Sequence, residues 1–122
     1  RRDACIAIDS WIEDRQATGI TSPFLIVGDW NDELTDPPQW NVFGPLLQAD
    51  DGGFLTLPLE EAGDHTYLPF DSFIDHAMVR GGDGAFERGR AEVLHLETSI
   101  SAYQSNVSDH VPVRVTLPLG PP

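Results

Sequence analysis

The sequence predicts an α/β fold in which helices cover a parallel or mixed β-sheet. An amphipathic helical pattern opens the chain, at residues 1–18. A short continuous apolar run follows at residues 24–27 and is typical of a strand buried on both faces. Residues 72–79 and 111–117 carry further strand patterns. With 122 residues, 40% of them hydrophobic, the chain is long enough for one domain or for part of one.

The first expected element is a helix over residues 1–18. Its apolar positions recur at spacings of three and four and define one face: Ala4, Cys5, Ile8, Trp11 and Ile12. Asp9, Glu13 and Asp14 are expected on the opposite face, and Gly19 ends the helix. Because no capping residue stands ahead of Arg1, we expect that the chain starts inside a longer natural sequence.

Turn residues divide the rest of the chain. Residues 39–49 predict one or two short helices, interrupted at Gly44-Pro45, and residues 51–53 predict a turn. Residues 54–69 hold two prolines and Gly63 and are expected to form a loop with short extended pieces. Strands are then expected at residues 72–79, 91–97 and 111–117, and residues 119–122 are expected to fray.

Composition excludes some classes of function. The chain has 20 acidic and 7 basic residues, for a net charge of −13, and it contains no lysine-rich or arginine-rich run, so it shows no surface that binds nucleic acid by charge alone. No window approaches the roughly 18 apolar residues of a membrane span. The single cysteine, Cys5, cannot form an intramolecular disulfide and is interpreted as a packing residue.

Acidic or imidazole groups interrupt apolar strand patterns at three places: residues 28–31 (GDWN), 73–79 (FIDHAMV) and 108–113 (SDHVPV). In the second, Asp75 is expected on the same strand face as Phe73 and Ala77, where an unpaired carboxylate would cost several kcal/mol. It therefore needs a cation, an imidazolium or a metal. The adjacent His76 points to the opposite face, whereas His110 is able to be the partner.

These residues provide the parts of a phosphate-ester hydrolysis site. A carboxylate that orients an imidazole, Asp75 on His110, would fix its tautomer and raise its basicity. The neighbouring carboxylates Asp29 and Asp109 would bind a hard divalent cation, which favours magnesium, manganese or calcium over zinc. With the amide of Asn31 as a further hydrogen-bond donor, such a site can stabilise the charge that develops on a phosphoryl group.

The three segments also resemble the motifs of a known family. GDWN is similar to the GDxN motif, FIDHAMV to the IDHI or IDYI motif, and SDHVPV to the terminal SDHxP motif of the endonuclease/exonuclease/phosphatase superfamily, the DNase I-like metal-dependent phosphoesterases. Their order and approximate separations match too, over residues 4–117. The resemblance implies a DNase I-like α/β sandwich and covers only its C-terminal half. Residues 1–122 are thus expected to be the C-terminal portion of one such domain.

The resemblance implies roles residue by residue. Asp29 would position the attacking water and contribute to the metal site, and Asn31 would contact the phosphate. Asp75 would orient His110, which would act as a hydrogen-bond donor or general base, and Asp109 would lie in the shell of a Mg²⁺, Mn²⁺ or Ca²⁺ ion. The upstream Asn, Glu and His that family members carry are absent from these 122 residues, so the N-terminal half of the domain is expected to be an essential partner. The position before the second motif, often basic in the family, is apolar here.

Alternatives remain open at this point. The substrate is a phosphodiester or a phosphomonoester in a nucleic acid, a nucleotide, a lipid headgroup or a sugar phosphate; a phospholipid or small-metabolite phosphodiesterase is favoured by the net charge of −13, and a non-catalytic binding module that keeps the fold is a third hypothesis. Asp29 and Asn31 also suit a turn cap, Asp75 a structural ion pair, and residues 108–110 the end of a loop. The other three histidines are expected to be structural or solvent-facing: His65, His76 and His95.

Overall fold

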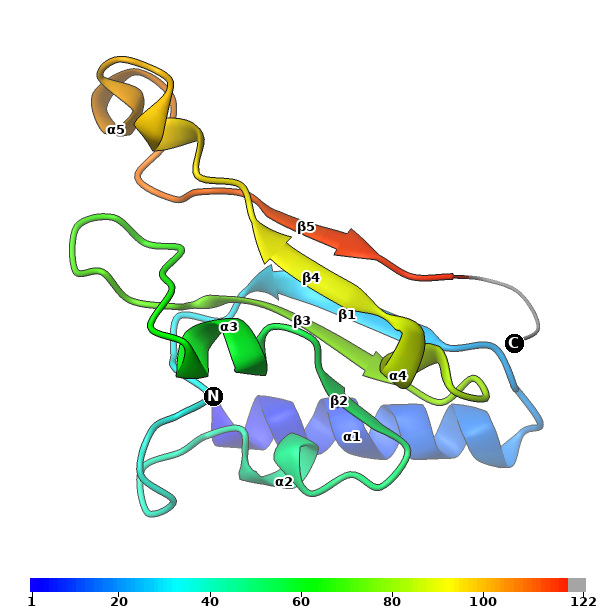
Figure 1. The fold of residues 1–122 in the computed structure, drawn as a ribbon. Helices are drawn as coiled ribbons and strands as arrows, with labels where there is room; N and C mark the ends of the chain where they lie inside the picture. Colours follow the sequence, from blue (N-terminus) through cyan, green and yellow to red (C-terminus); the bar gives the residue numbers. More distant parts are fainter. Residues whose placement is uncertain (119–122) are drawn as a thin grey trace.

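A computed structural model describes residues 1–118 of the chain, so the fraying expected at residues 119–122 lies outside the described residues. The elements appear in the following order (Figure 1): α1 (Arg2–Ala17), β1 (Phe24–Asp29), α2 (Gly44–Leu47), β2 (Gly52–Phe54), α3 (Leu57–Glu61), β3 (Asp75–Arg80), α4 (Ala85–Arg88), β4 (Arg90–Val93), the 3₁₀ helix η1 (Leu96–Thr98), α5 (Tyr103–Asn106) and β5 (Val113–Thr116).

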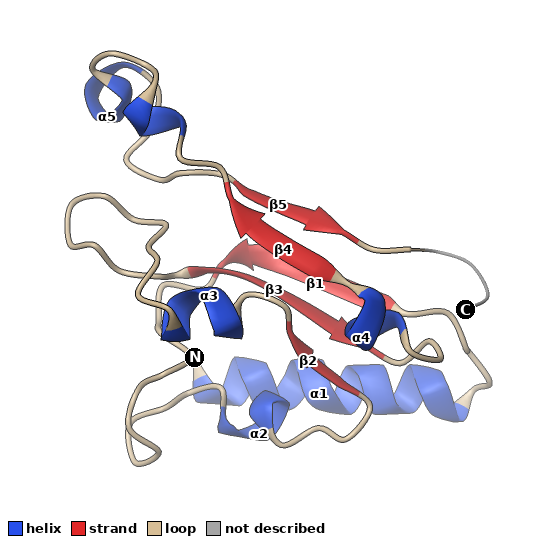
Figure 2. Ribbon diagram, in the orientation of Figure 1, coloured by secondary structure: helices blue, strands red, loops and turns tan. Residues whose placement is uncertain are grey.

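Two antiparallel sheets form the centre of the fold (Figure 2). One has the strand order β1-β3-β2, and the other pairs β4 with β5. The expectation of a parallel or mixed sheet was therefore wrong for the described residues, where every paired strand is antiparallel. The α/β class is confirmed, whereas the DNase I-like arrangement of a complete domain stays a prediction. No helix in residues 1–118 is both long and apolar enough to cross a membrane.

The elements lie in layers, with α1 and α2 on one side of the β1-β3-β2 sheet and the β4-β5 pair on the other (Figure 1). The larger core cluster joins the helices to the sheet and contains Cys5, Ile12, Leu34, Phe43, Leu46, Phe54 and Met78. A smaller cluster of Leu55, Val79 and Ala85 packs against apolar side chains of β4 and of the chain around β5. Burial of these groups supplies the main driving force for folding.

Helix α1 confirms the predicted helix to within one residue at each end. Cys5 and Ile12 are buried as the pattern indicates, whereas Trp11 lies at the rim, where it meets the edge of Phe24. The position expected for Asp9, on the solvent-facing side, was wrong. Asp9 accepts a hydrogen bond at 2.5 Å from Arg80, a guanidinium buried at the end of β3, so the carboxylate is needed on the sheet side of the helix.

Strand β1 lies at an edge of its sheet, and only one of its faces is partly buried. Phe24 and Ile26 pack against the larger core, whereas Leu25 and Val27 are 45% and 60% exposed. The expectation of a strand buried on both faces was therefore wrong for the described residues. The sequence does not show that Leu25 and Val27 are exposed, because a continuous apolar run gives the same pattern whether one face of a strand is covered or both.

Other element boundaries differ from the sequence predictions for local reasons. Helix α2 begins at Gly44-Pro45 instead of breaking there, because proline fits the first turn of a helix. Gly52 lies in β2, not in a turn, and a Cβ added to it would come within 2.0 Å of the Val79 carbonyl oxygen. The expected loop 54–69 contains α3, and β4 ends at Val93.

The second motif strand begins at Asp75 instead of residue 72. Residues 73 and 74 precede β3, so strict alternation does not reach them. As a consequence Phe73 stacks on the His76 ring at 5.5 Å between centroids, on the face opposite the one expected for it.

Candidate active site

The aspartates of the first two motifs meet at one end of the central sheet. Asp29 closes β1 and Asp75 opens β3, and the two are direct cross-strand partners in the antiparallel register. Asp29 and Asp75 are 46 positions apart in the sequence. They are neighbours in the fold because the pairing of β1 with β3 extends as far as these two residues. The other residues of the candidate site lie around this pair of carboxylates.

Asp75 holds the imidazole of His110. The Nδ1–H of His110 donates to Asp75 Oδ2 at 2.7 Å, and the two side chains are 28% and 23% exposed. A bond of this length to a carboxylate is charge-assisted. It fixes the ring so that Nε2 is the nitrogen left for a ligand. The pairing proposed from the two sequence patterns is present.

Backbone hydrogen bonds hold both members of this pair in place. Fully buried Thr66 accepts the N–H groups of Ile74 and Asp75, each at 3.1 Å from its Oγ1. On the other side, the Tyr103 hydroxyl donates to the His110 carbonyl at 3.0 Å. These contacts bring the three chain segments together at Asp75 and His110, and sequence reasoning assigned no role to Thr66 or Tyr103.

The third motif is shaped by its serine. The His110 N–H donates to Ser108 Oγ at 3.0 Å, which turns the chain immediately before the histidine. The Tyr67 ring lies 4.9 Å from the His110 ring, centroid to centroid, and covers one side of it. The loop-ending role weighed for residues 108–110 is therefore present together with the pairing to Asp75.

Asp29 and Asn31 form a tight turn after β1. Asn31 adopts a left-handed backbone with φ of 54°, a conformation that asparagine tolerates better than most residues. Its N–H donates to Asp29 Oδ1 at 2.8 Å, as in an Asx turn. The turn-cap alternative is thus correct as a description of the backbone. It leaves Asp29 Oδ2 for another contact.

Both residues and the third motif line one open pocket of about 520 Å³. Its lining comprises Asp29, Asn31, Asp32, Glu33, Asp36, Tyr67, Phe70, Ser72, Ile74, Asp109 and His110. The four motif residues Asp29, Asn31, Asp109 and His110 therefore line one cavity. Asp75 lies behind His110 and is hydrogen-bonded to it. Sequence reasoning assigned no role to Asp36, Tyr67 or Phe70; only the carboxylates directly after Asn31 carried a signal, because they stand next to the motif.

Carboxylates shift the pKa values of two groups at this pocket. Partial burial alone would lower the pKa of His110, but the hydrogen bond and charge of Asp75, with the charges of Asp29 and Asp109, raise it above its usual value. Burial raises the pKa of Asp36, and a hydrogen bond with Asp32 and nearby negative charges raise it further. The pocket thus favours cations.

The donor chemistry of the pocket suits a hard divalent cation, since its acidic lining residues offer oxygen atoms only. The number of converging donors is short of a closed site. Within residues 1–118, the only group of three or more acidic, histidine or cysteine ligand atoms that all lie within 4.8 Å of one another is elsewhere, at His65, His95 and Glu97. Asp29 and Asp109 would therefore hold a cation only together with further ligands.

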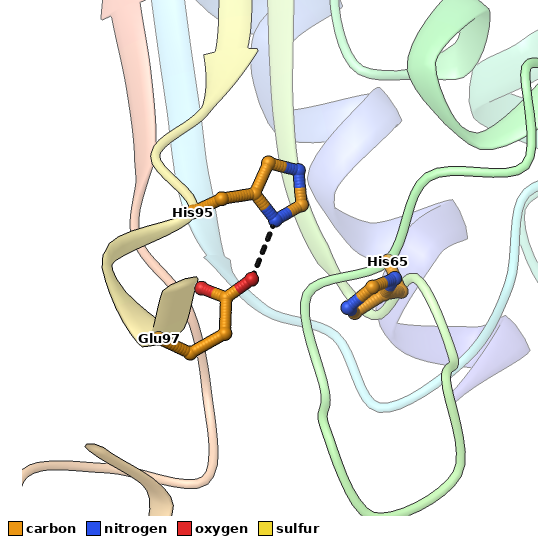
Figure 3. Close-up of side chains that lie close together, drawn as sticks. All are labelled: His65, His95 and Glu97. Atoms are coloured by element: carbon orange, nitrogen blue, oxygen red, sulfur yellow. Dashed lines mark hydrogen bonds and ion pairs between the residues drawn. The ribbon is translucent and has the colours of Figure 1, made fainter. Parts of the chain in front are cut away.

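The remaining histidines have separate environments. His76 is buried and structural, as expected: its Nε2 bonds the Asp32 carbonyl at 2.9 Å, and burial lowers its pKa. His65 and His95 lie against each other with Glu97 (Figure 3). A hydrogen bond to Glu97 raises the pKa of His95, against the opposing effect of burial, and the charge of Asp64 raises it further. No motif spacing in the sequence indicates this group.

Comparison with known proteins gives no family assignment: no protein-family model matches the sequence, and no curated protein or solved structure matches it either. The family resemblance therefore rests on the three motifs alone.

Proposed function

We propose that this chain contributes one half of the active site of a divalent-metal-dependent phosphoesterase. The observation that carries the proposal is the meeting of three distant segments at one pocket, with Asp29, Asn31, Asp109 and His110 in its lining and Asp75 bonded to His110 at 2.7 Å. A structural network alone would not require an imidazole to face an open pocket lined with carboxylates.

Each side chain has a chemical task in this proposal. Asp29 Oδ2, the oxygen left free by the Asx turn, positions the attacking water by accepting its hydrogen bond. His110 Nε2–H donates to a phosphoryl oxygen, and Asp75 keeps the ring in the protonation state and orientation that this needs. The Asn31 amide supplies a neutral donor to the same phosphate. A divalent cation held by Asp29, Asp109 and ligands from outside this chain would polarise the phosphoryl group.

The charge of the pocket favours a small substrate. Asp32, Glu33 and Asp36 add three carboxylates to those of Asp29 and Asp109. Arg1 donates to Asp32 at 3.0 Å and neutralises part of this field. A polyanion would be repelled over many phosphates, whereas a lipid headgroup or a small phosphodiester presents one or two. A phosphodiesterase for phospholipids or small metabolites is therefore the preferred subclass within the proposal.

A release assay tests the proposal. The complete protein that carries this chain is incubated with a lipid phosphodiester, a sugar phosphate and DNA, with Mg²⁺ and with excess chelator. We expect chelator-sensitive release from the phosphodiester, lost on His110→Gln and on Asp29→Asn while the circular dichroism spectrum stays unchanged. Chelator-resistant release, or normal rates in both variants, would contradict the proposal. Binding of phosphate esters without any release would instead support a non-catalytic module.

The same proposal predicts the behaviour of the isolated 122-residue chain. Because its pocket supplies too few converging ligands for a closed cation site, this polypeptide alone should release almost no product in Mg²⁺. Turnover equal to that of the complete protein would show that no other segment contributes to the site.

A further inference from the structure

A second cluster of ligating side chains lies outside the candidate active site. His65 belongs to the loop between α3 and β3, and His95 and Glu97 follow β4 (Figure 3). One ligand atom from each of the three lies within 4.8 Å of the other two. The His65 and His95 rings stand 5.5 Å apart between centroids, at an angle of 63°.

Asp64 arranges the two histidines. Its Oδ1 accepts the backbone N–H of His65 at 2.8 Å and lies 3.0 Å from His95 Nε2. The same oxygen thus positions the main chain of one histidine and the ring of the other. A metal-binding histidine usually binds the metal through one ring nitrogen while a carboxylate holds the other. Here Asp64 holds Nε2 of His95, so Nδ1 is the inner nitrogen, the one that would bind a metal.

The inner nitrogen, His95 Nδ1, lies 2.8 Å from Glu97 Oε1 (Figure 3). The other oxygen of Glu97, Oε2, is buried and has no hydrogen-bond partner within the described part of the chain. A buried carboxylate oxygen without a partner is costly.

We propose that His65, His95 and Glu97 form a site for Zn²⁺ or a similar transition-metal ion, with Asp64 as the support of His95. Two imidazoles and one carboxylate are a ligand set that zinc accepts, with a water molecule in the fourth position. Magnesium and calcium prefer oxygen ligands, so the site differs in kind from the carboxylate pocket at Asp29.

The place of the site in the fold gives it a structural role. The backbone carbonyl of Thr66, the residue after His65, accepts a hydrogen bond from the Val111 N–H at 2.8 Å. The N–H of Leu94, the residue before His95, donates to the Pro112 carbonyl at 2.8 Å. The two histidines therefore stand beside the two chain segments that hold residues 110–112. A metal bound between His65 and His95 would fix the two segments that flank the one carrying His110. This structural role does not require the proposed phosphoesterase function.

Zinc titration tests the inference. The complete protein is freed of metal with a chelator, and Zn²⁺ is added in competition with a chromophoric chelator. We expect saturable zinc binding that His65→Gln and His95→Gln each weaken at least tenfold, and that Asp64→Asn weakens by about tenfold or more. Glu61→Gln, an exposed carboxylate on the neighbouring helix, is the matched control and should leave the affinity unchanged. Co²⁺ should give the intense visible absorption of a four-coordinate site.

The inference is overturned if the unmodified protein binds no zinc, if both histidine variants keep the affinity unchanged, or if millimolar Mg²⁺ displaces the zinc. His110→Gln separates the two sites, since it should abolish phosphoester release and leave zinc affinity intact. A loss of zinc affinity in that variant would place the ion in the candidate active site and refute the inference. Thermal unfolding of each metal-free variant checks folding, and because two histidines are tested separately, misfolding of one still leaves a decisive variant.

Discussion

Replacing Asp75 by asparagine tests how the site is held together. The substitution keeps the size of the side chain and removes its charge from a 2.7 Å contact with His110. Hydrogen bonds to charged groups contribute about 1.5–3 kcal/mol, and fully exposed ion pairs about 0.2–1 kcal/mol. Because the two side chains are 23% and 28% exposed, we place the loss of unfolding free energy between these ranges, at about 1–1.5 kcal/mol in acidic solution.

The loss should depend on pH. The folded protein raises the pKa of His110 above its value in the unfolded chain, about 6.5. The stabilisation by this ion pair is therefore complete below about pH 6.5 and disappears as the pH rises through the folded pKa. Urea unfolding of the complete protein at pH 5.5 and pH 9 measures it. We expect a larger difference between the unmodified protein and Asp75→Asn at pH 5.5 than at pH 9.

The control is Asp71→Asn. Asp71 is an exposed aspartate in the neighbouring turn with φ of 51°, a backbone conformation that asparagine also adopts. It should change the unfolding free energy by less than about 0.5 kcal/mol at either pH. An equal loss for Asp75→Asn at both pH values would mean that the charge of Asp75 does not stabilise protonated His110, and the electrostatic account of the site would be wrong.

Three further substitutions test the scaffold, each by urea unfolding. Thr66→Val should cost about 1–3 kcal/mol, because two backbone N–H groups lose their acceptor inside the protein; a neutral effect would show that these groups find other partners. Arg80→Met should cost about 1.5–3 kcal/mol, because the partly exposed carboxylates of Asp9 and Asp51 lose their charge-assisted hydrogen bonds from Arg80; a more stable variant would show that burying the charge outweighs its pairing. Gly52→Ala should prevent folding or cost more than about 3 kcal/mol, since the new Cβ would lie 2.0 Å from the Val79 carbonyl oxygen, and a change below about 1 kcal/mol would show that β2 shifts without difficulty.

Sequence patterns predicted the long regular elements well and the short ones poorly. Helix α1 is confirmed because its sixteen residues repeat the apolar spacing several times. Helix α3 has five residues and no room for a repeat, so the two prolines and the glycine of residues 54–69 indicated a loop. Strand direction was mispredicted because a buried apolar run carries no information about the direction of its neighbour.

One contact of the candidate site was predictable from the sequence, whereas the roles of its residues stay predictions. A carboxylate at a buried strand position requires a partner on physical grounds, and the Asp75–His110 contact fulfils that requirement. The contributions of Thr66 and Tyr103 were not predictable, because both act through backbone groups that become neighbours only after folding. The His65–His95 contact joins residues 30 positions apart with no shared motif, so the sequence offered no sign of it.

The turn at Asp29 links backbone shape to chemistry in a way that limits how position 29 can be altered. One oxygen of this carboxylate is committed to the Asn31 N–H, so any ion or water bound there receives a single oxygen. Alanine at this position would release the turn as well as the reactive group, and glutamate would move its oxygens out by one methylene. Asparagine keeps an acceptor of the same length for that N–H while removing the charge, so this replacement separates loss of reactivity from loss of local shape.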